Sequence, residues 1–360
     1  MKKLHTILLV LGVAFLAYLL RDIGVRELWR QLTLLGWGLV PLLLSEGVAE
    51  MIHTLGWRRC LSGPLRSLPF HLLFRVRMAG YAINYLTPTA ALGGEVARAT
   101  LLVPYGRGSQ VVSALLIDKA CGAFGHLLFV VIGSVVIWRR VNLPAPLGAA
   151  MIFAAGLLAA GIIAFLLLQI YGKLGVVFRW LAKRKIGGQK LQTAASQITA
   201  VDDAFRVFYR ERPLDLALAV GWHVLAYPVG ILQTWLFFAL LEPHASWAVA
   251  ANVWFLGLWF DLLTFAVPFN LGTLEGSRIV AFKAIGYQAL EGMTYGMTLR
   301  LALVFWAAFG LVNYALLAAH PARLRAEQAI GDEDPREPRL GGKPEEVRAR
   351  ADARPPGLGI

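Results

Sequence analysis

Long apolar runs separated by short polar intervals dominate this chain of 360 residues. A helix of about twenty apolar residues is long enough to cross the hydrocarbon of a bilayer. Runs of about this length predict membrane-spanning helices at roughly 4–20, 34–57, 109–137, 147–170, 214–241, 246–267 and 290–319. Together with two interrupted elements between them, the pattern predicts an all-α, polytopic transmembrane helix bundle of about 7–8 spans.

The two interrupted elements carry the same residue types at the same spacing. In each, a glutamate lies seven residues after a proline, an arginine follows three residues later, and glycine lies between. These residues are Pro88, Gly93, Gly94, Glu95 and Arg98 at about 79–102, and Pro268, Gly272, Glu275 and Arg278 at about 268–287. Proline interrupts a helix, and broken backbone at membrane depth survives only inside protein or beside a wet cavity. We therefore expect two broken or re-entrant helices in a pseudo-repeat, parallel or inverted, that converge on one watery pocket.

Further charges lie inside the predicted spans. Asp118 and Lys119 come about nine residues into the span at 109–137, and as neighbours they point to different faces of its helix. Arg300 follows Glu275 at nearly the same sequence separation as Lys119 follows Glu95. Each half of the repeat therefore includes a cation in the span that follows its break. We interpret His126 as a satisfied interior histidine.

A polar stripe also marks the second span, where Glu46, Glu50 and His53 are four and three residues apart. Ionisable groups at this depth are costly in lipid, so the stripe faces the protein interior. Two readings stay open, a polar seam between helices and a site for a proton or a lipid headgroup.

Composition and charge support a membrane protein. The chain is 58% hydrophobic and only 16% charged, and its mean hydropathy is +0.61. The net charge of +13 is better explained by basic cytoplasmic loops than by nucleic acid. We predict a multi-pass protein of the cytoplasmic membrane, with residues 58–78 as a basic loop and helix start on the cytoplasmic side. The two cysteines form no CxxC motif, and we expect no metal site, disulfide framework or cofactor.

Three segments complete the predicted organisation. The N-terminal run resembles a signal peptide, but no small-x-small site follows it, so we expect an uncleaved first span. Residues 171–213 are basic and amphipathic, and they predict either a helix on the cytoplasmic leaflet or a linker helix packed on loops. Residues 321–360, rich in Pro, Gly, Arg and Glu, predict a disordered polar tail after a membrane domain at 1–320.

The charged breaks suit a phosphate. A helix N-terminus attracts anions, and the arginine fork makes two parallel bonds to phosphate. We therefore expect a lipid headgroup to contact Glu95, Arg98, Asp118 and Lys119 in the first half, and Glu275, Arg278 and Arg300 in the second. The alternative is that each Glu–Arg pair neutralises itself and only holds a helix in place.

The same motifs resemble a known family. Gly93-Gly94-Glu95-Val-Ala-Arg98, Leu116-Ile-Asp118-Lys119 and Pro268-Phe-Asn-Leu-Gly272-Thr-Leu-Glu275-Gly are similar to those of the lysylphosphatidylglycerol synthase transmembrane region family, which are flippase-like membrane proteins. The resemblance covers roughly residues 5–320 and implies a prokaryotic membrane protein that moves or binds a lipid. Large members carry a soluble aminoacyl-transferase domain, and the final forty or so residues here are too few for one. We therefore expect no enzymatic activity.

Three functions stay open at this stage. The first is a flippase for a phospholipid or glycolipid. The second is a membrane-embedded lipid-modifying enzyme, although the sequence has no His-His-carboxylate cluster to support it. The third is a non-transporting partner of cell-envelope biosynthesis enzymes. No GxxxxGK[ST] motif occurs, so transport would use an ion gradient or run downhill. The oligomeric state is left open.

Overall fold

A computed structural model describes residues 24–86, 93–140, 145–171, 205–241, 246–263 and 270–319, together with positions 18, 21, 202–203, 244 and 267. Two compact units divide the chain, Met1–Ala318 and Ala319–Ile360. The described residues leave out nearly all of the predicted span at 4–20, most of the linker at 171–213, the tail at 321–360, and both Pro88 and Pro268.

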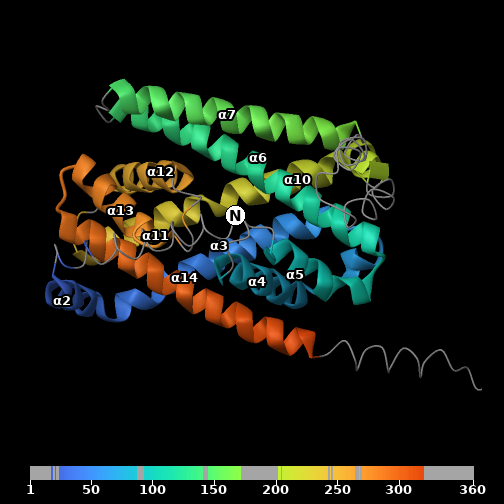
Figure 1. Ribbon diagram of the computed structural model, residues 1–360, viewed down its shortest axis with the longest axis horizontal. Coiled ribbons are helices and arrows are strands. Elements are labelled where there is room, and N and C mark those ends of the chain that lie inside the picture. The colour runs from blue at the N-terminus through green and yellow to red at the C-terminus, as the bar shows by residue number, and fades with distance from the viewer. Residues whose placement is uncertain are drawn as a thin grey trace, which may run out of the picture. The chain divides into compact units, whose positions relative to one another are not determined.

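The described part of the chain is helical throughout and contains no strand, which confirms the all-α prediction. Its long helices are arranged as Figure 1 shows. They are α2 (Val25–Leu35), α3 (Leu39–Cys60), α4 (Phe70–Leu86), α5 (Gly93–Leu102), α6 (Gly108–Arg140), α7 (Ala145–Ile170), α10 (Pro213–Ala226), α11 (Pro228–Leu241), α12 (Trp247–Leu263), α13 (Thr273–Ala284) and α14 (Ala289–Ala318). Short 3-10 turns at Gly36–Gly38, Gly63–Ser67 and Val103–Tyr105 connect some of them.

Four helical stretches in the described chain are long and apolar enough to cross a membrane. They are Val25–Cys60, Gly108–Ser134, Pro213–Leu241 and Ala289–Ala318. Apolar side chains such as Ile132, Phe153, Leu157 and Val312 are exposed along the helices, as expected where lipid is the solvent. These stretches support a multi-pass membrane protein, while the count of 7–8 spans and the re-entrant path stay predictions.

The predicted interruptions fall between separate helices. In the first, α4 ends at Leu86 and α5 begins at Gly93; in the second, α12 ends at Leu263 and α13 begins at Thr273. A third interruption separates α10 from α11 at Tyr227, directly before Pro228. Proline has no N–H to continue the ladder of helix hydrogen bonds, which explains this break.

Glycines let three helices approach closely around the first interruption. A side chain at Gly94 of α5 would collide with the carbonyl oxygen of Gly80 in α4 and with Asn84. A side chain at Gly310 of α14 would collide with the carbonyl oxygen of Met78 on another side of α4. Backbone contact of this kind is how small residues join membrane helices, and it holds α4 firmly between α5 and α14.

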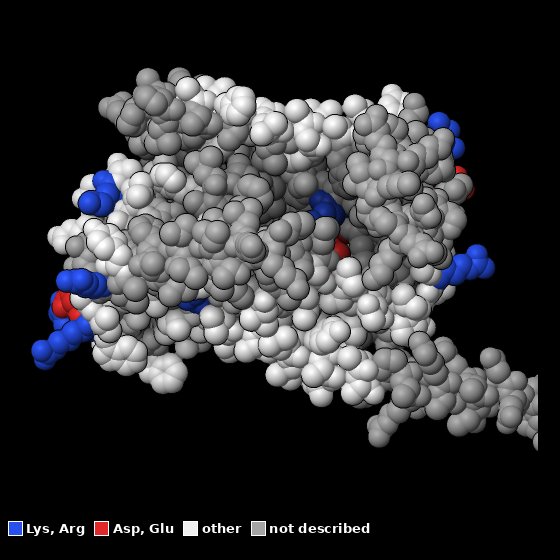
Figure 2. Space-filling view, viewed as in Figure 1, with Lys and Arg blue, Asp and Glu red and all other residues white. Residues whose placement is uncertain are grey.

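Charged side chains are unevenly distributed on this fold. In Figure 2 the described basic and acidic groups gather mainly at the two ends of the visible face, and a few lie inside a hollow near its middle. Charge at the ends of apolar helices is expected at the two membrane surfaces, whereas charge between them requires an explanation.

Candidate functional site

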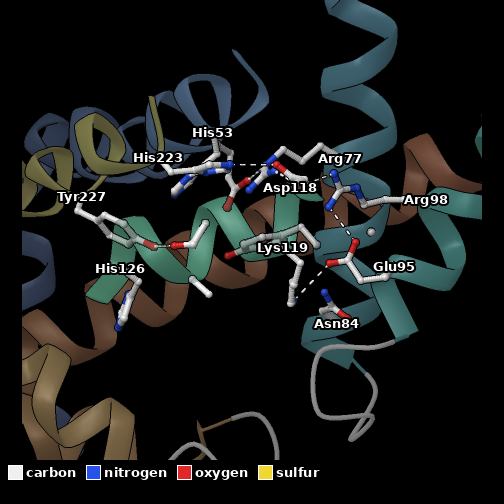
Figure 3. A pocket seen from close by; sticks show the side chains of 15 residues that line it. His53, Arg77, Asn84, Glu95, Arg98, Asp118, Lys119, His126, His223 and Tyr227 are labelled. Carbon is white, nitrogen blue, oxygen red and sulfur yellow. Dashed lines mark hydrogen bonds and ion pairs between the residues drawn. The ribbon is translucent and has the colours of Figure 1, made fainter. Parts of the chain in front are cut away.

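A cavity of about 320 Å³ opens among α3, α4, α5, α6 and α10, and we call it the charged cavity. Figure 3 shows the side chains that line it. They include three acidic and three basic residues and three histidines: Glu50, Glu95 and Asp118; Arg77, Arg98 and Lys119; and His53, His126 and His223. The charged cavity therefore has no formal net charge when its histidines are neutral.

Asp118 is the centre of the polar contacts in the charged cavity. Its carboxylate is only 4% exposed and accepts a hydrogen bond from Nη2 of Arg98 at 2.8 Å. His223 Nε2 lies 3.0 Å from the other carboxylate oxygen, and Nη1 of Arg77 lies 3.6 Å away. One buried carboxylate thus holds two arginines and a histidine from three different helices.

Arg98 and Glu95 pair on one face of α5, as their spacing predicts. Nη1 of Arg98 donates to Glu95 at 2.9 Å, and its guanidinium lies 3.9 Å from the centre of the Trp57 ring. Glu95 also accepts a hydrogen bond from Nζ of Lys119 at 3.3 Å. The structure therefore brings together Glu95, Arg98, Asp118 and Lys119, the four predicted residues of the first half.

Asp118 and Lys119 face in different directions, as expected for neighbours on a helix. The side chain of Lys119 is 45% exposed, whereas that of Asp118 is 4% exposed. Lys119 is therefore the solvent-accessible cation of this pair of neighbours, and Asp118 is enclosed by protein.

The polar stripe on α3 lies inside the protein. Glu50 accepts a hydrogen bond from Nε of Arg77 at 2.5 Å, and Nδ1 of His53 lies 2.8 Å from Nδ1 of His223. Glu46 accepts a hydrogen bond from the Tyr81 hydroxyl at 3.4 Å. Two members of the stripe, Glu50 and His53, thus line the charged cavity.

A second cavity of about 210 Å³ adjoins the stripe. Glu46 lines it together with Ser45, Gln233 and Trp254. Glu50, His53 and Tyr227 line both this second cavity and the charged cavity. These three side chains therefore form the partition between the two spaces.

Sequence reasoning missed several residues of the charged cavity. Arg77 was assigned to a basic cytoplasmic loop and helix start, but it lies in α4 with its side chain 15% exposed and paired with Glu50. His223 received no role, although a histidine within the apolar run of α10 was a usable signal. Nothing in the local pattern pointed to Asn84 or Tyr227 as lining residues.

The N-terminus of α5 has fewer free N–H groups for an anion than the sequence suggested. The backbone N–H of Gly94, in its first turn, donates to the side-chain oxygen of Asn84 at 2.6 Å. One of the first amides of the helix is therefore satisfied within the protein rather than left for a ligand. Cationic side chains, more than the helix end, supply the positive charge of the charged cavity.

The second half repeats the pairing of charges seen in the first. Glu275 is fully buried and accepts two hydrogen bonds from Arg300, at 2.8 and 3.0 Å. Arg278 donates to Asp261 of α12 at 2.7 Å. As in the first half, the arginine bonds an aspartate from a neighbouring helix and the glutamate bonds a cation of the following span.

These second-half residues do not line either cavity. Neither Glu275, Arg278 nor Arg300 is among the side chains around the charged cavity or the second cavity. The expectation that both breaks converge on one pocket therefore stays a prediction, since the break residues themselves, including Pro88 and Pro268, lie outside the described part of the chain. Gly272 adopts a φ of 72° before α13, a conformation that glycine takes at little cost.

The described residues do not form a metal centre, since no group of three or more His, Cys, Asp or Glu side chains among them could hold an ion. The ionisable side chains of the charged cavity instead form a set of equal positive and negative charges inside a bundle of apolar helices. The fold and site define a multi-pass membrane protein with a buried polar site.

The chain belongs to the family described as the lysylphosphatidylglycerol synthase TM region, whose model matches residues 6–323. A protein described as a UPF0104 membrane protein, from Methanothermobacter thermautotrophicus, is 25% identical over 300 residues, which cover 79% of this chain and 87% of that protein. No solved structure matches the chain. The family suggested by the sequence motifs is thus confirmed.

Proposed function

We propose that this protein binds the phosphate-bearing headgroup of a membrane lipid in the charged cavity and moves that lipid across the cytoplasmic membrane. The observation that carries the proposal is a cavity inside apolar helices that holds Arg77, Arg98 and Lys119 beside three carboxylates. Ionisable groups at such depth are expensive, and they are typical of substrate and ion pathways. The proposal assigns no covalent step to the chain.

Charge balance supports a lipid that must be released again. Arg98 is held by Glu95 and Asp118 at 2.9 and 2.8 Å, so an incoming phosphate competes with carboxylates for the same guanidinium. Planar guanidinium groups bind phosphate through two parallel hydrogen bonds. Competition of this kind allows recognition without the irreversible binding that unopposed cations would give.

Size and position also fit a headgroup. The volume of about 320 Å³ falls at the lower end of the roughly 300–1,000 Å³ typical of small-molecule sites. Basic residues near the end of α3, Arg58 and Arg59, together with Arg66, favour a cytoplasmic position for that end. The proposal therefore includes the cytoplasmic membrane as the location of the protein.

Transport of labelled phospholipid in reconstituted vesicles tests the proposal. The purified protein should accelerate movement of a fluorescent phospholipid between leaflets, and Arg98→Gln should slow it about tenfold or more, because hydrogen bonds to charged groups contribute about 1.5–3 kcal/mol. Arg30→Gln is the matched control, since the Arg30 side chain is 61% exposed on α2.

Two outcomes would contradict the proposal. Movement no faster than in empty vesicles, for every anionic and zwitterionic headgroup tried, would remove transport as the function. Transport that persists when Arg98 and Lys119 are both replaced by alanine would show that the lipid does not pass through the charged cavity.

A further inference from the structure

Two histidines and an aspartate form a continuous hydrogen-bonded chain at the back of the charged cavity (Figure 3). Nδ1 of His53 lies 2.8 Å from Nδ1 of His223, and Nε2 of His223 lies 3.0 Å from the carboxylate of Asp118. The three residues come from α3, α10 and α6. We call this chain the histidine relay.

The geometry determines which ring nitrogens carry hydrogen. Asp118 is held by two arginines and can only accept, so Nε2 of His223 must be the donor in their hydrogen bond. A neutral His223 then has a bare Nδ1, which accepts a hydrogen from Nδ1 of His53. In the neutral relay His53 therefore carries its hydrogen on Nδ1 and leaves Nε2 bare.

Access to the relay is through His53. His223 is only 2% exposed, whereas His53 is partly exposed and lines both cavities. A proton can therefore reach Nε2 of His53 without passing the buried ring of His223. The second cavity offers this proton an approach that is separate from the space assigned to the headgroup.

We propose that the histidine relay binds a proton and couples its movement to that of the lipid headgroup; the proposal rests on the proposed function. A proton adds to Nε2 of His53, and the hydrogen on Nδ1 of His53 passes to Nδ1 of His223. His53 is then neutral again, and His223 is an imidazolium beside the carboxylate of Asp118. Only N–H bonds form and break, and one positive charge moves from the first ring to the second.

This charge changes what the arginines can bind. Asp118 now lies beside a full cation at 3.0 Å, which competes with Arg98 and Arg77 for the same carboxylate. At the same time the charged cavity, neutral by formal count, becomes positive by one charge. Both effects favour an anionic headgroup, and by linkage a bound headgroup favours the proton.

The ionisable groups around the histidine relay nearly cancel in formal charge, so one added proton is a large change. From α3, α4 and α5 they are Glu46, Glu50, Arg77, Tyr81, Glu95 and Arg98. Elsewhere they are Lys119 and His126 of α6 and Tyr227 between α10 and α11. With Asp118 included, four carboxylates face three permanent cations, so one proton on the relay changes the formal charge of this whole set from minus one to zero. Glu46 does not line the charged cavity, and within that cavity the same proton changes the formal charge from zero to plus one.

A pH gradient across reconstituted vesicles tests the coupling. One proton moved per lipid should shift the steady-state distribution of a short-chain phosphatidylglycerol between leaflets by up to about tenfold per pH unit. Albumin extraction of the outer leaflet measures that distribution. His53→Gln and His223→Gln should leave the lipid evenly distributed, with the ratio near one at any gradient.

His71→Gln is the matched control, because His71 is exposed on α4 and lines neither cavity. This variant should keep the full response to the gradient. A wild-type distribution that ignores the pH gradient while transport continues would overturn the coupling, as would a full response in both relay variants.

Nitrogen NMR of histidine-labelled protein in lipid nanodiscs tests the relay without any transport. The wild type should show one ring with hydrogen on Nδ1 and a partner ring with hydrogen on Nε2, joined by a short hydrogen bond. His53→Gln should remove the first signal, and His126→Gln should leave both. If these signals are present but vesicles show no transport, the proposed function fails and the proton site stands; if the signals are absent, the relay itself is refuted.

Discussion

Replacing Glu275 by glutamine should destabilise the protein far more than the same replacement of Glu95, its counterpart in the repeat. Glu275 is completely buried and accepts two hydrogen bonds from Arg300 at 2.8 and 3.0 Å. Removing one partner of a buried ion pair costs about 3–5 kcal/mol, because the other charge stays buried without compensation.

Glu95 is in a different environment. Its side chain is 19% exposed, and its partner Lys119 is 45% exposed. Arg98 keeps Asp118 as a partner at 2.8 Å when Glu95 is lost. Pairs that water can reach contribute about 0–1 kcal/mol, so the two variants should differ by roughly 3 kcal/mol in the free energy of unfolding.

Unfolding in mixed micelles by increasing the fraction of sodium dodecyl sulfate measures this difference. Tryptophan fluorescence and circular dichroism should report the same transition, which is the test for two-state unfolding. Adding Arg300→Gln to the Glu275 variant should recover part of the loss, because the uncompensated guanidinium is removed. Equal stabilities for the two glutamine variants, or a greater loss for the Glu95 variant, would refute this reasoning. The Glu275–Arg300 pair would then contribute no more to folding than the pair of Glu95 and Lys119.

Three further predictions concern packing, recognition and reactivity. Gly94→Ala should lower the free energy of unfolding by about 1–3 kcal/mol through steric overlap, whereas Gly156→Ala, with nothing within 4 Å of the added carbon, should be neutral or slightly stabilising in the same assay. Arg98→Lys should keep the charge but weaken binding of a phospholipid measured in nanodiscs, because lysine lacks the fork that now bonds two carboxylates. Cys60 and Cys121, each 1% exposed, should react with a maleimide only after unfolding, as mass spectrometry would show.

The helices themselves could be predicted from the sequence with good accuracy. The runs at 147–170 and 290–319 became α7 (Ala145–Ile170) and α14 (Ala289–Ala318), because apolar length and helix geometry are local properties. The break before Pro228 was also predictable, since proline acts on its own turn of helix.

The local part of the site was predictable for the same reason. Glu95 and Arg98 share a face of α5 because they are three residues apart, and they do pair. Lys119 follows Glu95 by 24 residues and Arg300 follows Glu275 by 25, and both pairs are present. The nearly equal spacing in the sequence was therefore enough to predict which glutamate and which cation form an ion pair.

The remainder of the site could not be predicted because it depends on how helices pack. His223 meets Asp118 across 105 residues of sequence, and Arg77 meets Glu50 across an intervening turn of the chain. No local pattern distinguishes an arginine in a surface loop from one turned into the bundle. The separation of Arg278 from the charged cavity is likewise a property of packing, since the repeat itself is the same in both halves.

Tyr227 occupies the point where α10 gives way to α11, and it is also one of three side chains that divide the charged cavity from the second cavity. The junction of two half-helices and the partition between two internal spaces therefore share one residue. A change in the angle between α10 and α11 would therefore also displace a side chain that lies between the two cavities.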